Sequence, residues 1–430
     1  MTGTVCVADT LELEIKLCNK EIVFSESLST SKFQQKGFKR QISNIRPWWP
    51  NGMGDRPLYE LEVVLKDKTG RHFDQYNKLI GFKRIEWRNC LDAPEGADPW
   101  LCVVNGRKIF LQGINWTPIR PNFADVDESE YRRRLELYQS IGLNILRVWG
   151  GASLEKPCFY DLCDQLGLMI WQEFPLSSSG IENYPPDDQQ MVDQYLRIVR
   201  SYISRLHHHV CLLLWSGGNE LTNLDGTPVG LEHPMFRGAF NLVREKDVQH
   251  RFVPTSPSGP SFLGVQDNYG KGRHWDVHGP WKVDGELNKH WKSYWQSDDS
   301  LFRSELGAPG PSSAELIQKY AGNLDSMPQL KNPLWRRTSW WLEMDQYIKE
   351  NGSSPKTVEE YVEWGQQRQS TILSTAVWSC KNRFPRCGGV ILWMGHDSFP
   401  CTANTSIVDF EGIAKPAAMA LAKIFNERIE

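Results

Sequence analysis

A change in sequence pattern near residue 100 constrains the fold more than any other feature of this chain. From there onward, short apolar runs alternate with segments whose apolar residues recur every three or four positions. The runs are typical of buried parallel strands and the periodic segments of amphipathic helices, so the alternation predicts βα units around a parallel sheet. The predicted strands are residues 108–115, 144–149, 168–173, 210–215, 251–256, 275–278, 301–305 and 389–393.

Eight such strands favour an α/β fold of one kind, the TIM (β/α)8 barrel, in which a helix follows each strand. Asp127 and Glu130 form a capping pattern ahead of an apolar stripe, which predicts that the first helix begins there. We assign the barrel to residues 99–430, with an insertion between 323 and 365. Further helices are expected at 159–166, 188–207 and 415–428.

The segment before the barrel has a different pattern, in which short β-type runs are separated by turn signals. Residues 58–65 alternate apolar and charged side chains, residues 67–70 form a turn, and residues 79–86 read as a further strand. This pattern predicts a small β-sandwich domain, which we assign to residues 1–98.

Charge and hydropathy exclude several classes of protein. Lys and Arg number 49 against 52 for Asp and Glu, and the resulting net charge of -3 is spread without a basic stripe, so no nucleic-acid partner is expected. No apolar run approaches the roughly 20 residues that cross a bilayer, which predicts a soluble protein with no membrane association. The first residues, Met1 to Cys6, carry no basic and apolar signal for secretion, and the compartment stays open.

Neither a metal site nor a cofactor is predicted. The 10 cysteines include no C-x-x-C pair and are read as unpaired thiols, and His207, His208 and His209 are expected to be solvated residues at a helix end. Aromatic residues stand out instead, since 18 Trp, 18 Phe and 13 Tyr make up 11% of the chain. Flat aromatic rings stack on the apolar faces of sugars, so the excess raises a carbohydrate hypothesis.

Two glutamates mark the expected active site. Reactive groups of TIM barrels lie at the C-terminal ends of the strands, and there Glu220 follows strand four while Glu305 ends strand seven. Paired carboxylates flanking a sugar suit glycoside hydrolysis. The separation of the two groups would be about 5 to 5.5 Å for retention of configuration and about 6.5 to 9.5 Å for inversion, and the sequence leaves this open.

The predicted strand ends carry the motifs Asn115-Trp116, Arg147-Val-Trp-Gly-Gly151, Trp171-Gln-Glu173, Trp215-Ser-Gly-Gly-Asn-Glu220, Ser304-Glu-Leu-Gly307 and Gly389-Val-Ile-Leu-Trp393. These motifs resemble those of glycoside hydrolase family 2, which includes β-galactosidases, β-glucuronidases and β-mannosidases. Upstream, Trp48-Trp-Pro-Asn-Gly52, Leu58-Tyr59 and Gly81-Phe82 resemble the immunoglobulin-like domain that precedes the barrel in this family. The resemblance therefore covers nearly the whole chain and implies a TIM barrel preceded by a small immunoglobulin-like β-sandwich.

The resemblance implies a role for each catalytic glutamate. Asn219-Glu220 matches the family's acid/base motif and Ser304-Glu-Leu-Gly307 its nucleophile motif, so Glu220 is expected to be the general acid/base and Glu305 the nucleophile. Trp215 and the second carboxylate are expected to raise the pKa of Glu220. Arg147 and Glu173 are expected to form a buried ion pair that orients the nucleophile.

The expected sugar contacts are an amide and three tryptophans. Asn219 would hydrogen-bond the sugar 2-OH, and Trp393 would form the platform beneath the first sugar. Trp149 and Trp281 would wall it, and Asn115 and His278 complete the predicted substrate contacts.

The motifs at residues 147–151 and 215–220 look most like β-mannosidases and plant-type endo-β-mannosidases, with exo-β-glucosaminidases close behind. We therefore predict a retaining hydrolase of terminal β-mannosides acting on an oligosaccharide or glycoside. β-Galactosidase and β-glucuronidase activities, exo or endo action and the oligomeric state stay open. The chain has no room for the sugar-binding domain with which the family usually begins, so a truncated, weakly active carbohydrate-binding barrel is the alternative, and a metal-activated hydrolase is disfavoured.

Overall fold

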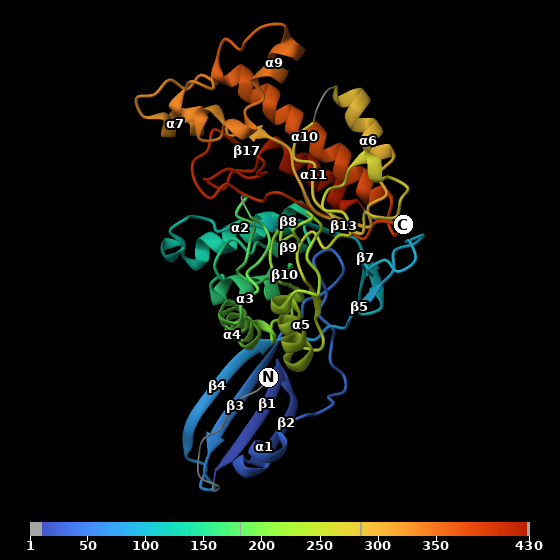
Figure 1. The fold of residues 1–430 in the computed structure, drawn as a ribbon. Coiled ribbons are helices and arrows are strands. Elements are labelled where there is room, and N and C mark those ends of the chain that lie inside the picture. The colour runs from blue at the N-terminus through green and yellow to red at the C-terminus, as the bar shows by residue number, and fades with distance from the viewer. Residues whose placement is uncertain (1–10, 181, 284–285, 428–430) are drawn as a thin grey trace.

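The computed structural model describes residues 11–180, 182–283 and 286–427. It is elongated, with an N-terminal sheet at one end, a barrel in the middle, and a helical segment around α7 and α9 at the other end (Figure 1). No helix in the described part of the chain is long and apolar enough to cross a membrane.

The N-terminal domain contains one four-stranded antiparallel sheet of order β2-β1-β3-β4. Its strands are β1 (Glu12–Asn19), β2 (Glu21–Ser29), β3 (Tyr59–Lys66) and β4 (His72–Ile80), and α1 (Thr30–Lys36) follows β2. Alternation along the strands sends Leu13 and Ile15 to a buried face with Phe33 of α1, while Lys66 pairs with Glu14 at 3.0 Å on the other face. In residues 11–98 the predicted sandwich is thus represented by one sheet with a helix and a loop packed on it.

The predicted strand at 79–86 is wrong in its bounds, because β4 ends at Ile80 and a separate strand, β5 (Ile85–Arg88), begins after a break. A Cβ at Gly81 would lie 2.7 Å from Val210, so the chain passes against the barrel here and leaves the sheet. The ammonium group of Lys83 then donates to the carbonyls of Val210 and Leu212. Contact with the barrel, rather than local pattern, ends the strand.

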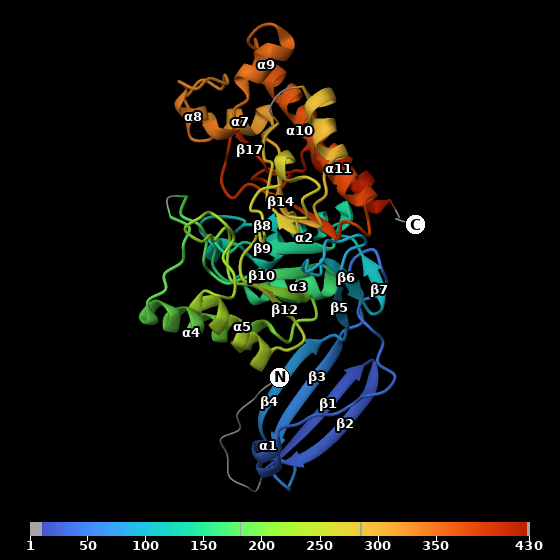
Figure 2. The ribbon, with the colours of Figure 1, turned by 45° about the vertical axis from the view of Figure 1, so that its right-hand side comes forward.

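All eight predicted barrel strands are present in one parallel sheet of order β12-β11-β10-β9-β8-β16-β14-β13. The sheet curls around a core (Figure 2), and loop residues complete the circle, since Gly259 and Asp276 exchange backbone hydrogen bonds of 3.2 Å. The strands are β8 (Leu111–Trp116), β9 (Ile145–Val148), β10 (Met169–Glu173), β11 (Leu212–Ser216), β12 (Arg251–Val253), β13 (Asp276–Val277), β14 (Phe302–Leu306) and β16 (Gly389–Leu392).

The first predicted barrel strand, 108–115, is in fact two elements. β7 (Arg107–Ile109) belongs to a small sheet with β5 and β6 (Leu101–Val104), and only β8 enters the barrel. Asn105 and Gly106 have φ values of 50° and 85°, as a tight hairpin turn between β6 and β7 requires. This Asn-Gly pair is the signal that separates the hairpin from the barrel strand.

Helices cover the outside of the barrel. They are α2 (Glu128–Ile141), α3 (Pro157–Leu166), α4 (Gln189–Leu206), α5 (Pro234–Lys246), α6 (Lys292–Gln296), α10 (Val358–Asn382) and α11 (Pro416–Asn426), with short turns η1 (Phe123–Asp125), η2 (Gln266–Asn268) and η3 (Leu287–Trp291). Asp127 accepts a hydrogen bond of 3.0 Å from the backbone of Glu130, as the capping pattern predicts.

The insertion before α10 ends earlier than predicted, at residue 357 rather than 365, because Thr357 caps the long helix that begins at Val358. It also begins before residue 323, because it holds α7 (Ala314–Ala321) as well as α8 (Pro333–Arg336), η4 (Ser339–Trp341) and α9 (Met344–Asn351). A two-stranded sheet, β15 (Gly310–Pro311) with β17 (Ala403–Asn404), ties its base to the loop after β16.

The motif at residues 48–52 attaches the N-terminal domain to the barrel. Trp48 is fully buried and its indole N–H donates to the carbonyl of Asp164 at 2.7 Å. Asn51 donates to the carbonyls of Gln139 and Leu143 at 2.9 Å. A cavity of about 1140 Å³ lies between the sheet and helices α3 and α4, on the side of the barrel where these contacts are made.

Candidate active site

The structure brings the two predicted catalytic carboxylates together. One oxygen of Glu220, one oxygen of Glu305 and one ring nitrogen of His278 all lie within 4.8 Å of one another. Glu305 is almost fully buried, with 4% of its side chain exposed, whereas 24% of the Glu220 side chain is exposed. Glu220 is therefore the carboxylate that faces solvent and Glu305 the one held beneath it.

Glu220 has a left-handed backbone conformation, with φ of 54°, which is uncommon outside glycine and costs of order 1 kcal/mol. Neighbouring loops hold it there, since its N–H donates to the carbonyl of Ser256 at 2.7 Å and that of Asn219 donates to Leu176 at 2.9 Å. The next N–H, of Leu221, donates to the hydroxyl of Thr255 at 3.0 Å. This strained backbone aims the Glu220 side chain into the mouth of the barrel.

Arg147, which has no exposed side-chain surface, connects the carboxylates beneath the mouth. Its guanidinium group donates to Glu305 at 2.7 Å and to Glu173 at 2.9 and 3.1 Å. Further N–H groups donate to the side-chain oxygens of Asn115 and, at 2.5 Å, Asn219. The structure thus contains the Arg147–Glu173 pair expected from the sequence and extends it to the nucleophile candidate.

His278 stands between the two glutamates. Its Nδ1 lies 3.1 Å from an oxygen of Glu220 and 3.6 Å from an oxygen of Glu305, and its Nε2 lies 3.0 Å from the hydroxyl of Ser256. Burial lowers the pKa of His278 to about 4, so the ring is neutral at pH 7. With Ser256 donating to Nε2, the single N–H is on Nδ1 and is directed at the carboxylates.

The two carboxyl groups have opposite pKa shifts in the empty site. Burial raises the pKa of Glu305 to about 8 against the effect of Arg147, and the charge of Glu220 adds to the rise. The pKa of Glu220 is lowered, because hydrogen bonds from His278 and Ser178 outweigh the effect of burial. In the empty site the pKa of Glu305 is therefore the higher of the two.

The predicted surroundings of Glu220 are wrong in one respect. Trp215 does not line the site, because its ring stacks on Phe174 at 5.2 Å and its N–H donates to Asp247 at 2.8 Å, on the outer side of the sheet. Side chains alternate along a strand, so Ser216, which donates to Glu173 at 3.3 Å, faces inward in its place. The pKa of Glu220 is accordingly lowered rather than raised.

Two predicted sugar contacts also need correction. Asn115 is fully buried, and its amide donates to the carbonyls of Ser304 and Leu392 at 3.1 Å while its oxygen accepts from Arg147. His278 is likewise fully buried, with both ring nitrogens next to protein partners. Both residues position other side chains instead of facing the mouth, because strand-end residues that point into the barrel are covered by the layer above them.

Of the remaining predicted contacts, the three tryptophans are partly exposed. Trp149 and Trp393 are partly exposed and pack edge to face with ring centroids 5.6 Å apart. Trp281, also partly exposed, stands 6.2 Å from the ring of His278. The amide of Asn219 donates to Ser177 at 3.2 Å and is close to fully buried. The three tryptophans thus offer partly exposed aromatic surface, Trp281 beside His278 and Trp149 against Trp393.

Sequence reasoning missed Ser178 and gave no role to Asp276, which lies in the predicted strand at 275–278. Ser178 donates to Glu220 at 3.1 Å from the loop after β10, where residues 177–179 form a serine run that could have been noticed. Asp276 accepts hydrogen bonds from the hydroxyl of Ser304 at 2.6 Å and from the backbone N–H of Ser258 at 2.9 Å. These bonds join β14, the strand of Glu305, to β13 and to the loop after β12. Burial raises the pKa of Asp276 to about 6.

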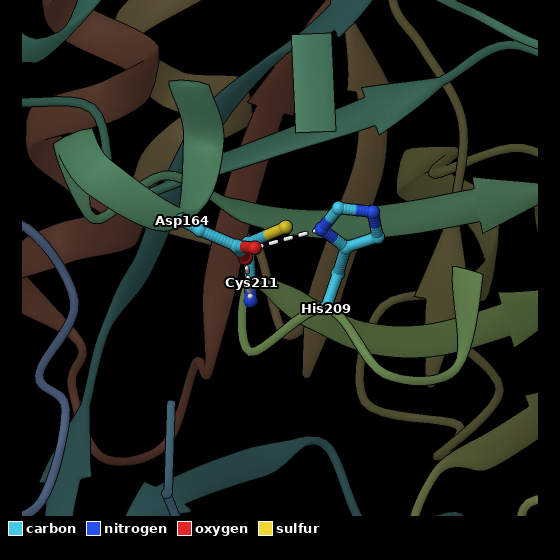
Figure 3. A group of neighbouring side chains, drawn as sticks. All are labelled: Asp164, His209 and Cys211. Carbon is cyan, nitrogen blue, oxygen red and sulfur yellow. Dashed lines mark hydrogen bonds and ion pairs between the residues drawn. The ribbon is translucent and has the colours of Figure 1, made fainter. Parts of the chain in front are cut away.

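A second cluster of metal-ligating types lies away from the mouth (Figure 3). Asp164, His209 and Cys211 are all buried, so the prediction of a solvated His209 is wrong. The carboxylate of Asp164 accepts from Nδ1 of His209 and from the backbone of Cys211, both at 2.7 Å. Because both carboxylate oxygens are used by N–H donors, this cluster fastens α3 to the start of β11, next to the Trp48 contact.

Two family models match the chain. Residues 99–240 match "Glycosyl hydrolases family 2, TIM barrel domain", and residues 6–83 match "Glycosyl hydrolases family 2". Between them the models cover about half of the chain, in the same order as the two domains of the fold. This chain belongs to glycosyl hydrolase family 2.

Curated family 2 relatives include two kinds of mannosidase. Beta-mannosidase B of Aspergillus terreus is 27% identical over 408 residues, which cover 88% of this chain and 46% of that protein. Mannosylglycoprotein endo-beta-mannosidase of Lilium longiflorum is 34% identical over 177 residues, which cover 40% of this chain and 18% of that protein. The chain spans about half the length of the beta-mannosidase B relatives it matches.

Solved structures share the family 2 fold. Beta-D-mannosidase of Dictyoglomus thermophilum superposes with a TM-score of 0.78 at 23% identity, over 96% of this chain and 51% of that one. An exo-beta-D-glucosaminidase, CsxA, superposes with a TM-score of 0.70 at 16% identity, over 97% and 49% of the two chains. The sheet domain and barrel are therefore arranged as in these two solved structures.

Proposed function

We propose that this chain carries the active site of a retaining glycoside hydrolase that cleaves terminal β-linked mannosides. The observation that carries the proposal is the approach of Glu220 and Glu305, whose nearest oxygens lie within 4.8 Å. Retaining enzymes have their two carboxyl groups about 5 to 5.5 Å apart, whereas inverting enzymes leave about 6.5 to 9.5 Å for a water molecule. The short separation favours direct attack by one carboxylate on the sugar.

In the proposed reaction Glu305 attacks the anomeric carbon while Glu220 protonates the departing glycosidic oxygen. The bond from the anomeric carbon to the leaving oxygen breaks as the ester bond to Glu305 forms. Glu220, now ionised, takes a proton from a water molecule that attacks the same carbon and releases Glu305. Two inversions at one carbon restore the β configuration.

The proposed reaction needs the proton on Glu220, whereas in the empty site the pKa of Glu305 is the higher of the two. A bound glycoside would cover the exposed part of Glu220 and remove water from it, which favours the neutral acid there. Arg147, 2.7 Å from Glu305, favours the ionised form of the nucleophile. His278 faces both groups, so the proton has a short path from Glu305 to Glu220 when the sugar binds.

The choice of β-mannosides rests on the relatives. Beta-mannosidase B proteins match 88% or more of this chain, and the lily endo-beta-mannosidase is the more identical over a shorter span. That second match makes an endo-acting β-mannosidase the second candidate function. Both candidates use the same two glutamates, and they differ in whether the sugar before the cleaved bond must be terminal.

A panel of p-nitrophenyl glycosides tests the proposal. We expect the purified chain to release p-nitrophenol from the β-mannoside faster than from the β-glucosaminide, β-galactoside or β-glucuronide. Proton NMR of the first product should detect the β-anomer. A first-formed α-anomer, or turnover of no member of the panel and of no internal β-mannoside linkage, would overturn the proposal.

Substitutions separate the roles of the two glutamates. Glu305→Ala and Glu220→Ala should each reduce kcat by at least about 10³-fold, since each removes a group that acts in the transition state. With an activated aryl mannoside, azide should rescue Glu220→Ala and give the β-mannosyl azide, because the covalent intermediate still forms. Wild-type rates for Glu305→Ala would exclude it as the nucleophile.

A further inference from the structure

An exposed tryptophan on the insertion stands apart from the rest of the aromatic surface. Of the 18 tryptophans, only Trp340 and Trp378 have more than half of their surface exposed to solvent, at 77% and 54%. All 18 lie in the described part of the chain. Exposing an indole forgoes the apolar burial that stabilises a fold, so Trp340 does not serve the core.

The segment that carries Trp340 is firmly held. Trp335, five residues before it, is fully buried in a separate core of the insertion and donates to the carbonyl of Ser326 at 3.0 Å. Trp341, directly after it, packs partly against the same core. Trp340 lies between them on the short turn η4, so its exposure is a property of an ordered turn fixed on both sides.

The same segment is placed at the catalytic end of the barrel. It belongs to the loop after β14, the strand of Glu305, and loops that follow the strands lie at the C-terminal face. The hydroxyl of Thr338 meets that of Thr402 at 2.5 Å, and the guanidinium group of Arg337 lies 4.5 Å from the ring of Phe399. These contacts join the segment to the loop after β16.

A second set of contacts reaches the loop after β13. The ammonium group of Lys282 lies 5.7 Å from the ring of Trp341, and Lys282 directly follows Trp281, which faces His278. The turn η4 is therefore held between the two loops that carry Trp281 and Trp393. Those are two of the three tryptophans predicted to contact the sugar.

We propose that Trp340 is a stacking platform for the leaving-group part of a β-linked oligosaccharide, beyond the sugar held between the two glutamates. This inference rests on the proposed function and names its substrate class as oligosaccharides rather than simple glycosides. The C–H face of a pyranose ring stacks on an indole and buries apolar surface on both. An aryl or methyl leaving group presents at most one ring to such a platform, whereas cleavage of the terminal bond of a tetrasaccharide leaves three sugars.

The test compares two substrates in matched variants. For p-nitrophenyl β-mannoside and β-1,4-mannotetraose, the ratio of kcat/KM values should shift about tenfold against the tetrasaccharide in Trp340→Ala, with most of the change in KM. Trp340→Phe, which keeps a flat ring, should recover most of the ratio. Trp378→Ala is the control, because Trp378 lies near the C-terminal end of α10, at the opposite face of the barrel, and should change neither substrate.

The outcomes separate the inference from the proposed function. Equal losses on both substrates in Trp340→Ala, or an unchanged ratio, would overturn the platform while leaving the hydrolase proposal intact. If the wild type hydrolyses no glycoside, the hydrolase proposal fails, and calorimetric titration with mannotetraose still tests Trp340. Binding that weakens about tenfold in Trp340→Ala supports the platform, whereas equal binding, or none to the wild type, overturns it.

Discussion

Replacing Arg147 by methionine should destabilise the protein in a manner that depends on pH. The guanidinium group makes three hydrogen bonds of 2.7 to 3.1 Å to Glu173 and Glu305, and neither Arg147 nor Glu173 has exposed side-chain surface. Methionine is similar in length but leaves two buried carboxylates without a cation. Removing one partner of a buried ion pair costs about 3 to 5 kcal/mol, and we expect this loss at pH 8.

The sign of the pH dependence follows from the two carboxyl groups. Burial already raises the pKa of Glu305 from 4.5 to about 8, and that of Glu173 is raised as well. A group with a raised folded-state pKa contributes stability that is complete below its unfolded value and is lost as the pH rises through the folded value. Without Arg147 both values rise further, so more stability is lost by pH 8. At pH 5 a larger share of these carboxyl groups is protonated, and the loss should be smaller, about 1 to 2 kcal/mol.

Urea denaturation followed by tryptophan fluorescence at pH 5 and pH 8 measures both losses. Arg134→Met is the control, because Arg134 is also buried but its guanidinium group donates to the carbonyl of Asp409 at 3.3 Å rather than to a carboxylate. It should lose no more than about 1.5 kcal/mol, equally at both pH values. Equal losses for Arg147→Met at the two pH values, or the same pH dependence in Arg134→Met, would refute the reasoning.

Three further predictions concern the site. His278→Phe removes the N–H that favours ionised Glu220 and should raise the pKa of that carboxyl group. The acidic limb of the pH profile of kcat/KM should therefore move up by about 1 to 2 pH units, and an unmoved limb would contradict this role of His278. Gly307→Ala should lower kcat/KM at least about tenfold, because the new Cβ would clash with the carbonyl oxygen of Trp393 and displace that residue. Wild-type kinetics would mean that the backbone adjusts without moving the Trp393 ring. Dialysis against EDTA should leave kcat/KM unchanged because two carboxyl groups suffice for the chemistry; a loss restored by Zn²⁺ would argue for a metal.

Local pattern predicted the barrel well because its strands are short apolar runs between periodic helices. It failed where a local pattern is interrupted by contacts distant in sequence. The strand expected at 79–86 breaks at Gly81 because Val210 of the barrel lies against it, and that contact spans more than a hundred residues. The early end of the insertion, by contrast, depends on the local cap at Thr357, which sequence reasoning overlooked.

The sequence by itself determined which residues stand at the strand ends, because the end of an apolar run identifies a position at the mouth of a parallel barrel. Glu220, Glu305, Arg147 and Glu173 were found in this way. Only the tertiary structure decided the partners of the side chains at the site. It places His278 between the two glutamates, and it directs the amide of Asn115 to two backbone carbonyls.

The pKa values of the two glutamates were also decided by the tertiary structure. The sequence pointed to a raised pKa at Glu220 through Trp215, but the alternation of the strand turns Trp215 outward and buries Glu305 instead. A pKa depends on burial and on the charges and donors around a group, and these come from loops distant in the chain. The order of residues in the sequence identifies the reactive groups, whereas the packing of the loops around them sets the pKa of each group.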